Sequence, residues 1–259
     1  MKSGKHRYFK YRDGNYEAYR DKDGVTVFDR NSGAYFFVEK GKGLPLWEWV
    51  PLKVKNQYIL PMLLSFTVVV TIMYVFGVVV RHNGILIAEY RYAPIVLFFL
   101  LVYGIFQAVL HEAAHIFALS TFGYSADKIG FKFDYGFVPS FFVRVNKVLL
   151  LPPGQRMTVH LAGVFINSVV NLLLLFLAQQ LNWGNVANAV FCLYSFGICV
   201  NFFPFFNSDG YKALICLLGI KEVMNEESIS LKVVRWLSFL FVAAYFLYTF
   251  YAIARFVRE

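Results

Sequence analysis

The sequence predicts an all-α polytopic membrane protein with about five transmembrane helices, accompanied by two small β elements. Of its 259 residues, 58% are hydrophobic and 19% are aromatic, and the mean hydropathy is +0.54. The hydrophobic residues form long runs instead of the periodic patterns of soluble domains, and about 20 such residues cross a bilayer. The predicted transmembrane helices cover 58–80, 92–122, 158–181, 186–206 and 233–256.

The first 57 residues form a different kind of segment, which is polar and charged. Turn signals at Asp13-Gly14, Asp23-Gly24 and Asn31-Ser32-Gly33 separate short runs of aromatic and β-branched residues. We expect a small β-rich segment over 1–57. A tail that becomes ordered only on the membrane or on a partner is the alternative. The remaining residues, 58–259, form the transmembrane domain.

The connection between the second and third predicted helices contains another β signal. Polar and apolar residues alternate over 128–134, which is the period of a strand, and a mainly apolar run follows over 137–145. These two runs predict a β-hairpin at the membrane surface. A plain interfacial loop is the alternative.

The distribution of basic residues predicts how the chain lies in the membrane. The segments 1–57, 123–157 and 207–235 hold 21 lysines and arginines, whereas the opposite side holds four. Basic residues concentrate on the cytoplasmic side of membrane proteins, so we expect a multi-pass protein of the cell membrane with a cytoplasmic N-terminus. The net charge of +9 then reflects topology in a lipid bilayer and requires no nucleic-acid partner.

The second predicted helix carries the most informative motif, His111-Glu112-Ala113-Ala114-His115. The two histidines lie one helical turn apart on one face, so both imidazoles can bind one zinc ion. Glu112 lies beside them and is the candidate general base. Ionisable residues in an apolar helix indicate function, because their desolvation is costly. A hydrogen-bonded pair of core histidines with a buried glutamate is the alternative.

A catalytic zinc ion needs a third protein ligand, and Asp209 is the main candidate. At 1.5 Å per residue, His111 lies about 28 Å from the outer end of the second helix and Asp209 about 34 Å from that of the fourth. Both residues are therefore expected near the cytoplasmic face. His160, at the start of the third helix, is the rival ligand. A helix-capping role for Asp209 is the alternative to any metal role.

Three motifs together resemble those of the site-2 protease family of intramembrane zinc metalloproteases. They are the histidine motif at 111–115, Ala162-Gly163-x-x-x-Asn167, and Asn201-x-x-Pro204 followed by Asp209-Gly210. The stretch from Gln155 to Gly163 is most similar to the peptide zinc metalloprotease branch of this family. Val164 and Ser208 depart from the family pattern, which usually has proline and leucine there, but neither change removes a ligand.

The resemblance implies a zinc metalloendopeptidase in which His111, His115 and Asp209 bind Zn²⁺ and Glu112 is the catalytic base. Asn167 is then expected to contact the substrate or the oxyanion, with a helix–helix contact as the alternative. The expected substrate is a membrane-embedded or hydrophobic peptide, such as the precursor of a secreted, ribosomally made peptide, and a peptide exporter is an expected partner. A non-proteolytic accessory protein for peptide binding or export is the alternative function. A transporter is disfavoured because the polar residues gather at one depth.

Overall fold

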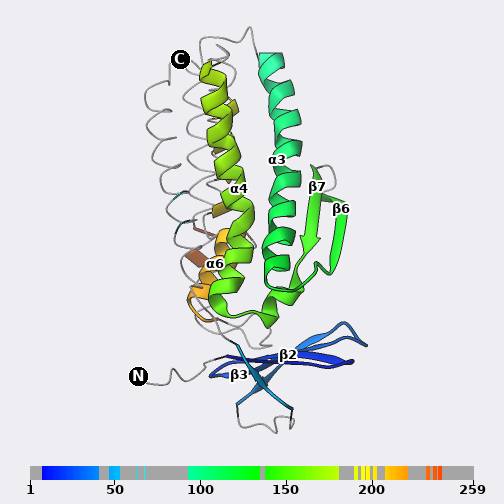
Figure 1. Ribbon diagram of the computed structural model, residues 1–259. Helices are drawn as coiled ribbons and strands as arrows, with labels where there is room; N and C mark the ends of the chain where they lie inside the picture. Colours follow the sequence, from blue (N-terminus) through cyan, green and yellow to red (C-terminus); the bar gives the residue numbers. More distant parts are fainter. Residues whose placement is uncertain are drawn as a thin grey trace.

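The computed structural model describes five continuous segments and several short helical pieces. The segments are 8–40, 47–52, 93–134, 138–180 and 208–220, and the helical pieces are at 63, 67, 190–191, 194–195, 197–198, 201–202, 232–233, 236–237 and 239–240. Figure 1 shows two long helices side by side, with a larger sheet beyond one end of them and a hairpin along the flank of one helix.

The N-terminal part of the chain forms a five-stranded antiparallel sheet with the strand order β4-β3-β2-β1-β5. Ala18, Val25 and Val27 form its core. The turn between the third and fourth strands contains Gly33, whose φ of 68° lies in the left-handed region that favours glycine. The strands are β1 (Phe9–Arg12), β2 (Tyr16–Arg20), β3 (Gly24–Asp29), β4 (Tyr35–Glu39) and β5 (Val50–Pro51).

Three α-helices are described: α3 (Ala93–Thr121), α4 (Pro153–Gln180) and α6 (Asp209–Leu217). The first two pack against each other, and α6 packs against α4. Proline suits the first position of α4 because no intrahelical partner is needed for an N–H there. Two stretches, Leu101–Thr121 and Pro153–Leu174, are long and apolar enough to cross a membrane.

A two-stranded hairpin, β6 (Lys128–Asp134) and β7 (Val138–Arg144), follows α3. The strands pair in antiparallel register, with Phe131 opposite Phe141, and the centroids of these two rings lie 5.3 Å apart. Strand β7 contacts α3 (Figure 1). The hairpin therefore lies beside the helix that carries the histidine motif.

The five-stranded sheet contacts the helical part through a short 3-10 helix, η2 (Asn146–Leu150), which β2 and β3 both touch. Arg156, in the first turn of α4, is buried and reinforces this junction. Its guanidinium donates hydrogen bonds of 2.6 Å to the carbonyls of Leu149 and Leu151 and lies 5.4 Å from the centre of the Tyr19 ring.

The predicted all-α fold class with about five transmembrane helices is wrong. Across the described residues, the three α-helices stand beside two antiparallel sheets, and two of these helices are long and apolar enough to span a membrane. Long apolar runs dominate the mean hydropathy of the sequence and so favour an all-α class. Strands are short, and the cross-strand pairs that stabilise them do not appear in the composition. The strands expected within 1–57 and the hairpin over 128–145 are present.

Two of the predicted helices correspond to helices of the structure. The prediction over 92–122 matches α3, and that over 158–181 matches α4, which begins earlier, at Pro153. The predicted helices over 58–80 and 233–256 lie outside the described residues, apart from single or paired helical positions. Of the residues in the predicted helix over 186–206, the structure describes only four helical pairs.

Candidate metal centre

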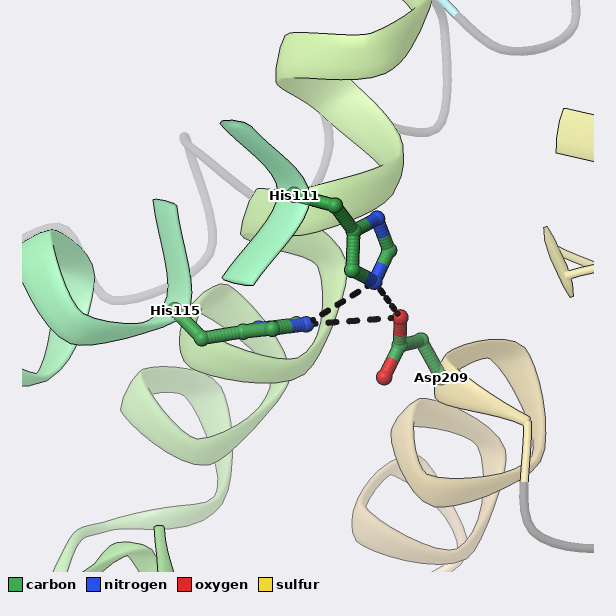
Figure 2. A group of neighbouring side chains, drawn as sticks. All are labelled: His111, His115 and Asp209. Carbon is green, nitrogen blue, oxygen red and sulfur yellow. Dashed lines mark hydrogen bonds and ion pairs between the residues drawn. The ribbon is translucent and has the colours of Figure 1, made fainter. Parts of the chain in front are cut away.

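The two histidines of the motif lie one turn apart on α3 and direct their rings to the same space (Figure 2). The Nε2 atoms of His111 and His115 are 3.1 Å apart, and the two rings are nearly perpendicular, at 83°. Residues four apart share a helix face, which is why the sequence spacing translates into this proximity. His115 is buried, with 6% of its surface exposed.

Asp209 joins the two histidines from the first position of α6 (Figure 2). Its Oδ2 atom lies 2.8 Å from His111 Nε2 and 3.5 Å from His115 Nε2. The candidate ligand atoms of the three residues all lie within 4.8 Å of one another. The carboxylate is also buried. The structure thus brings together the three residues that the sequence analysis selected as ligands.

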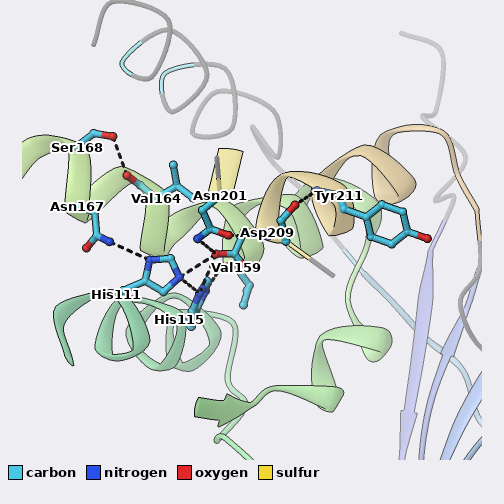
Figure 3. A network of polar contacts seen from close by, with 10 residues as sticks. His111, His115, Val159, Val164, Asn167, Ser168, Asn201, Asp209 and Tyr211 are labelled. Carbon is cyan, nitrogen blue, oxygen red and sulfur yellow. Dashed lines mark hydrogen bonds and ion pairs between the residues drawn. The ribbon is translucent and has the colours of Figure 1, made fainter. Parts of the chain in front are cut away.

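Ser208 takes over the capping of α6 from Asp209, and Asn201 holds the Asp209 carboxylate in place. Ser208, and not Asp209, caps α6, because its hydroxyl accepts a hydrogen bond of 3.1 Å from the Tyr211 amide. Asn201 donates a hydrogen bond of 3.1 Å to Asp209 Oδ2, and its own Oδ1 accepts one from the Asp209 amide (Figure 3). The capping alternative for Asp209 is therefore excluded by the observed cap.

The ring of His115 is oriented by the backbone of α4. Its Nδ1 lies 2.7 Å from the Val159 carbonyl oxygen, which can only accept a hydrogen bond. The proton of the neutral ring is therefore on Nδ1, and the lone pair on Nε2 faces His111 and Asp209. This is the arrangement that metal-binding histidines commonly adopt, with the second ring nitrogen bonded to a carbonyl or carboxylate.

The ring of His111 packs directly over Gly163 of α4. A Cβ atom at this glycine would lie 2.5 Å from His111 Nδ1 and 2.6 Å from His111 Nε2, which is too close for any side chain. On the same ring, Nδ1 lies 3.2 Å from the Asn167 carboxamide nitrogen (Figure 3). The close approach of α3 and α4 at this point therefore depends on glycine.

Glu112 lies at a cavity of about 310 Å³ that also reaches His111, Asn167 and Asn201. The backbone of Val143 in β7 lies close to the Glu112 carboxylate. The rest of the cavity wall is mostly apolar. It is formed by Ala108, Phe141, Val164, Tyr194, Gly197 and Ile198. The Glu112 carboxylate, beside the cluster of His111, His115 and Asp209, therefore faces a cavity that an apolar group can enter.

A chain of buried and half-buried polar side chains continues from the cluster along α3 and α4. Tyr103 donates a hydrogen bond of 3.1 Å to Asn171 Oδ1 and also pairs with Gln107. Asn171 in turn donates one of 2.6 Å to the Ser195 hydroxyl. The expectation that polar residues gather at one depth is therefore wrong. These bonds cross-link neighbouring helices, which is the usual role of polar side chains between apolar helices.

The sequence is similar to that of YydH from Bacillus subtilis (strain 168), a protein provisionally named as a peptide zinc metalloprotease. The two sequences are 30% identical over 217 residues, which cover 82% of this chain and 84% of the relative. The chain belongs to the peptide zinc metalloprotease branch of the site-2 protease family. No family model and no solved structure matches this sequence.

The residues of the cluster fit the metal that the family name implies. Two imidazoles and one carboxylate are the three-ligand set of many catalytic zinc sites, which leave a fourth position open. The observed Nδ1 contact of His115 leaves its Nε2 lone pair directed at the centre of the cluster. The carboxylate of Asp209 contributes the negative charge that stabilises a divalent cation there.

His160, the rival ligand, is buried in α4 but does not belong to the cluster formed by His111, His115 and Asp209. Sequence reasoning also missed contacts that the structure makes plain. Gly163 and Asn201 each belong to one of the three family motifs, so the sequence did mark both positions. It gave neither of them a role. The Val159 carbonyl carried no signal, because it is a backbone group.

Proposed function

We propose that this protein is a zinc metalloendopeptidase that hydrolyses peptide bonds of a membrane-embedded or hydrophobic peptide. The observation that carries this proposal is the meeting of His111, His115 and Asp209 beside Glu112, at the wall of a cavity. The similarity to a protein named for peptide proteolysis supports the same activity. The maturation of a secreted, ribosomally made peptide, together with a partner exporter, is the biological setting that we propose.

The reaction divides between the metal and the protein side chains. A bound zinc ion would polarise the scissile carbonyl and make water a stronger nucleophile at neutral pH. Glu112 takes a proton from the attacking water as the new carbon–oxygen bond forms. The same carboxyl group then gives this proton to the amine nitrogen as the carbon–nitrogen bond breaks. One water is consumed, and one peptide becomes two.

The mostly apolar wall of the cavity supports a hydrophobic substrate. A side chain next to the scissile bond can lie between Phe141, Val164 and Ile198 while its backbone passes Glu112. Strand β7 borders this space, and the backbone of its Val143 lies close to Glu112. An unwound peptide lying alongside β7 would therefore present its backbone to the base, and such pairing requires little sequence specificity.

We also propose that the protein lies in the cell membrane with its N-terminal sheet and active site at the cytoplasmic side. The two long apolar helices support insertion in a bilayer. The basic residues of the N-terminal segment support the orientation. Attachment of a membrane-impermeant label to a cysteine introduced at exposed Asn31 tests it: labelling of intact cells would contradict this orientation.

Replacement of the base tests the proposed reaction. Glu112→Gln keeps the size of the side chain but cannot accept a proton, so cleavage should fall at least about 100-fold. The measurement uses purified full-length protein in detergent with a mixture of quenched fluorescent apolar peptides, and mass spectrometry locates the cuts.

Zinc content provides the control for this experiment. It should stay at the wild-type level in Glu112→Gln, because no ligand is changed. Removal of zinc by a chelator should abolish cleavage by the wild type, and added zinc should restore it. Undiminished cleavage by the variant would refute the proposal, and peptide binding without cleavage by the wild type would favour the accessory function.

A further inference from the structure

We propose that Asn167 is a positioning residue for the metal, whose carboxamide oxygen accepts a hydrogen bond from the Nδ1–H of His111. This bond would hold the His111 ring in the tautomer that leaves Nε2 free to bind the ion. The proposal rests on the metal site proposed above. It assigns Asn167 a role different from the substrate or oxyanion contact that the sequence suggested.

The first step of the argument is the orientation of the His111 ring. Its Nε2 faces the cluster, 2.8 Å from Asp209 Oδ2 and 3.1 Å from His115 Nε2, while its Nδ1 faces Asn167 at 3.2 Å (Figure 3). A neutral imidazole carries one proton, and a metal binds the nitrogen that lacks it. Metal binding through Nε2 therefore requires a proton on Nδ1 and an acceptor opposite that proton.

The second step is an unsatisfied oxygen. Asn167 is buried, and its Oδ1 has no hydrogen-bond partner among the described residues, whereas its Nδ2 lies against the ring. Rotation of the carboxamide by about 180° exchanges the two atoms, so the oxygen faces Nδ1–H. Buried polar atoms are rarely left unpaired, and amide orientations are assigned from such networks.

The third step concerns the amide nitrogen after this rotation. Gln107, one turn before His111 on α3, has a buried Oε1 that also lacks a partner in the described part of the chain. Its own amide nitrogen lies 3.5 Å from the Asn167 backbone carbonyl, so the two residues are neighbours. After the rotation the Asn167 amide nitrogen is a free donor, and the neighbouring Gln107 has an unsatisfied acceptor in its Oε1.

The two possible roles of Asn167 require opposite ends of its carboxamide. Support of the His111 tautomer needs the oxygen, because the ring nitrogen is then the donor. Stabilisation of an oxyanion needs the nitrogen, because an oxyanion only accepts. Asn167→Asp keeps the oxygen and removes the donor, and a carboxylate behind a metal-binding histidine is a common arrangement. This substitution therefore separates the two roles.

The experiment measures zinc affinity of the full-length protein in detergent by competition with a chelator of known affinity. We expect Asn167→Asp to bind zinc as tightly as the wild type or more tightly. Asn167→Ala and the near-isosteric Asn167→Leu should bind 10–100-fold more weakly, the range found for partners of metal-binding histidines. Cobalt-loaded protein gives a second readout. The visible absorption bands of Asn167→Asp should match those of the wild type, and those of the other two variants should shift.

Unfolding temperature and gel filtration identify variants that do not fold, and either Asn167→Ala or Asn167→Leu suffices for the test. Wild-type zinc affinity in a folded Asn167→Ala or Asn167→Leu protein would overturn this proposal alone. Weak zinc binding by a folded Asn167→Asp variant would also overturn it. Absence of zinc binding by the wild type would instead refute the proposed function, and this inference with it.

Discussion

At the scale of single residues, the geometry of the centre depends on the absence of a side chain as much as on the ligands. Gly163 allows the His111 ring to lie against the α4 backbone. Val159, in α4, holds His115, and Asn201, in the helical piece at 201–202, holds Asp209. Metal-binding residues in general depend on such neighbours for orientation.

Gly163→Ala should displace the His111 ring, because the added Cβ would lie 2.5 Å from Nδ1. We expect zinc affinity to fall by at least about tenfold, as for other changes that misorient a ligand. Equilibrium chelator competition measures it. Gly104→Ala on α3 is the matched control, since its Cβ would meet Tyr194 at an ordinary 3.9 Å. Equal zinc affinity in both variants would contradict this account.

At the scale of elements, the start of α6 combines two tasks in adjacent residues. Ser208 caps the helix, and Asp209 turns its carboxylate to the histidines. Leucine, which the family usually has in place of Ser208, has no oxygen to cap with, so the departure from the family pattern has a structural use here. The hairpin is the other element at the site, because β7 contributes Phe141 to the cavity wall.

Ser208→Ala should destabilise the start of α6 by about 1 kcal/mol, the usual cost of a lost N-cap. Because Asp209 is the next residue, zinc affinity should fall a few-fold as well. Ser208→Thr keeps an oxygen at the cap and should retain both properties. Thermal unfolding and zinc titration of the two variants provide the comparison, and indistinguishable variants would show that the cap has no such role.

Phe131→Pro should lower peptide cleavage while zinc content stays normal. Proline removes a backbone N–H and fixes φ, so it disrupts the pairing of β6 with β7 opposite Phe141. The hairpin is proposed to support the substrate alongside β7, and loss of its order should reduce cleavage several-fold. Phe131→Val retains strand propensity and should cleave at close to the wild-type rate. Unchanged cleavage by the proline variant would remove the hairpin from the mechanism.

At the scale of the whole molecule, a small β-sheet is joined to a pair of long apolar helices. The junction is formed by η2 and by Arg156, whose guanidinium bonds two carbonyls and covers the Tyr19 ring. This junction lies where the chain enters α4, the helix that orients both histidines through Val159, Gly163 and Asn167. The sheet therefore supports the part of the molecule from which the site is built.

Arg156→Met should loosen the sheet from the helices. The substitution keeps an apolar stem but removes two charged hydrogen bonds, with an expected loss of about 2–3 kcal/mol in unfolding free energy. Limited proteolysis should cut within 8–40 faster, and the unfolding temperature should drop. Arg156→Lys retains one donor group and should show a smaller effect. Zinc binding should change by less than about threefold, and a proteolysis rate equal to that of the wild type would contradict the proposed junction.

The sequence by itself determined the local features of this protein. The spacing of His111 and His115 fixes their common helix face, and the alternation over 128–134 matches β6, because helix and strand periods are local properties. Long apolar runs predicted α3 and α4, but the same runs led to an all-α class that the two sheets contradict.

Only the tertiary structure decided which partners surround each ligand. Val159 lies 44 positions from His115 and Asn167 lies 56 positions from His111, and the room left by Gly163 is visible only once α3 and α4 are packed. Such contacts depend on how helices rotate against each other, and no periodicity along one chain records that rotation. The physical reason is that hydrogen bonds and packing act over a few ångströms in space, whatever the separation in sequence.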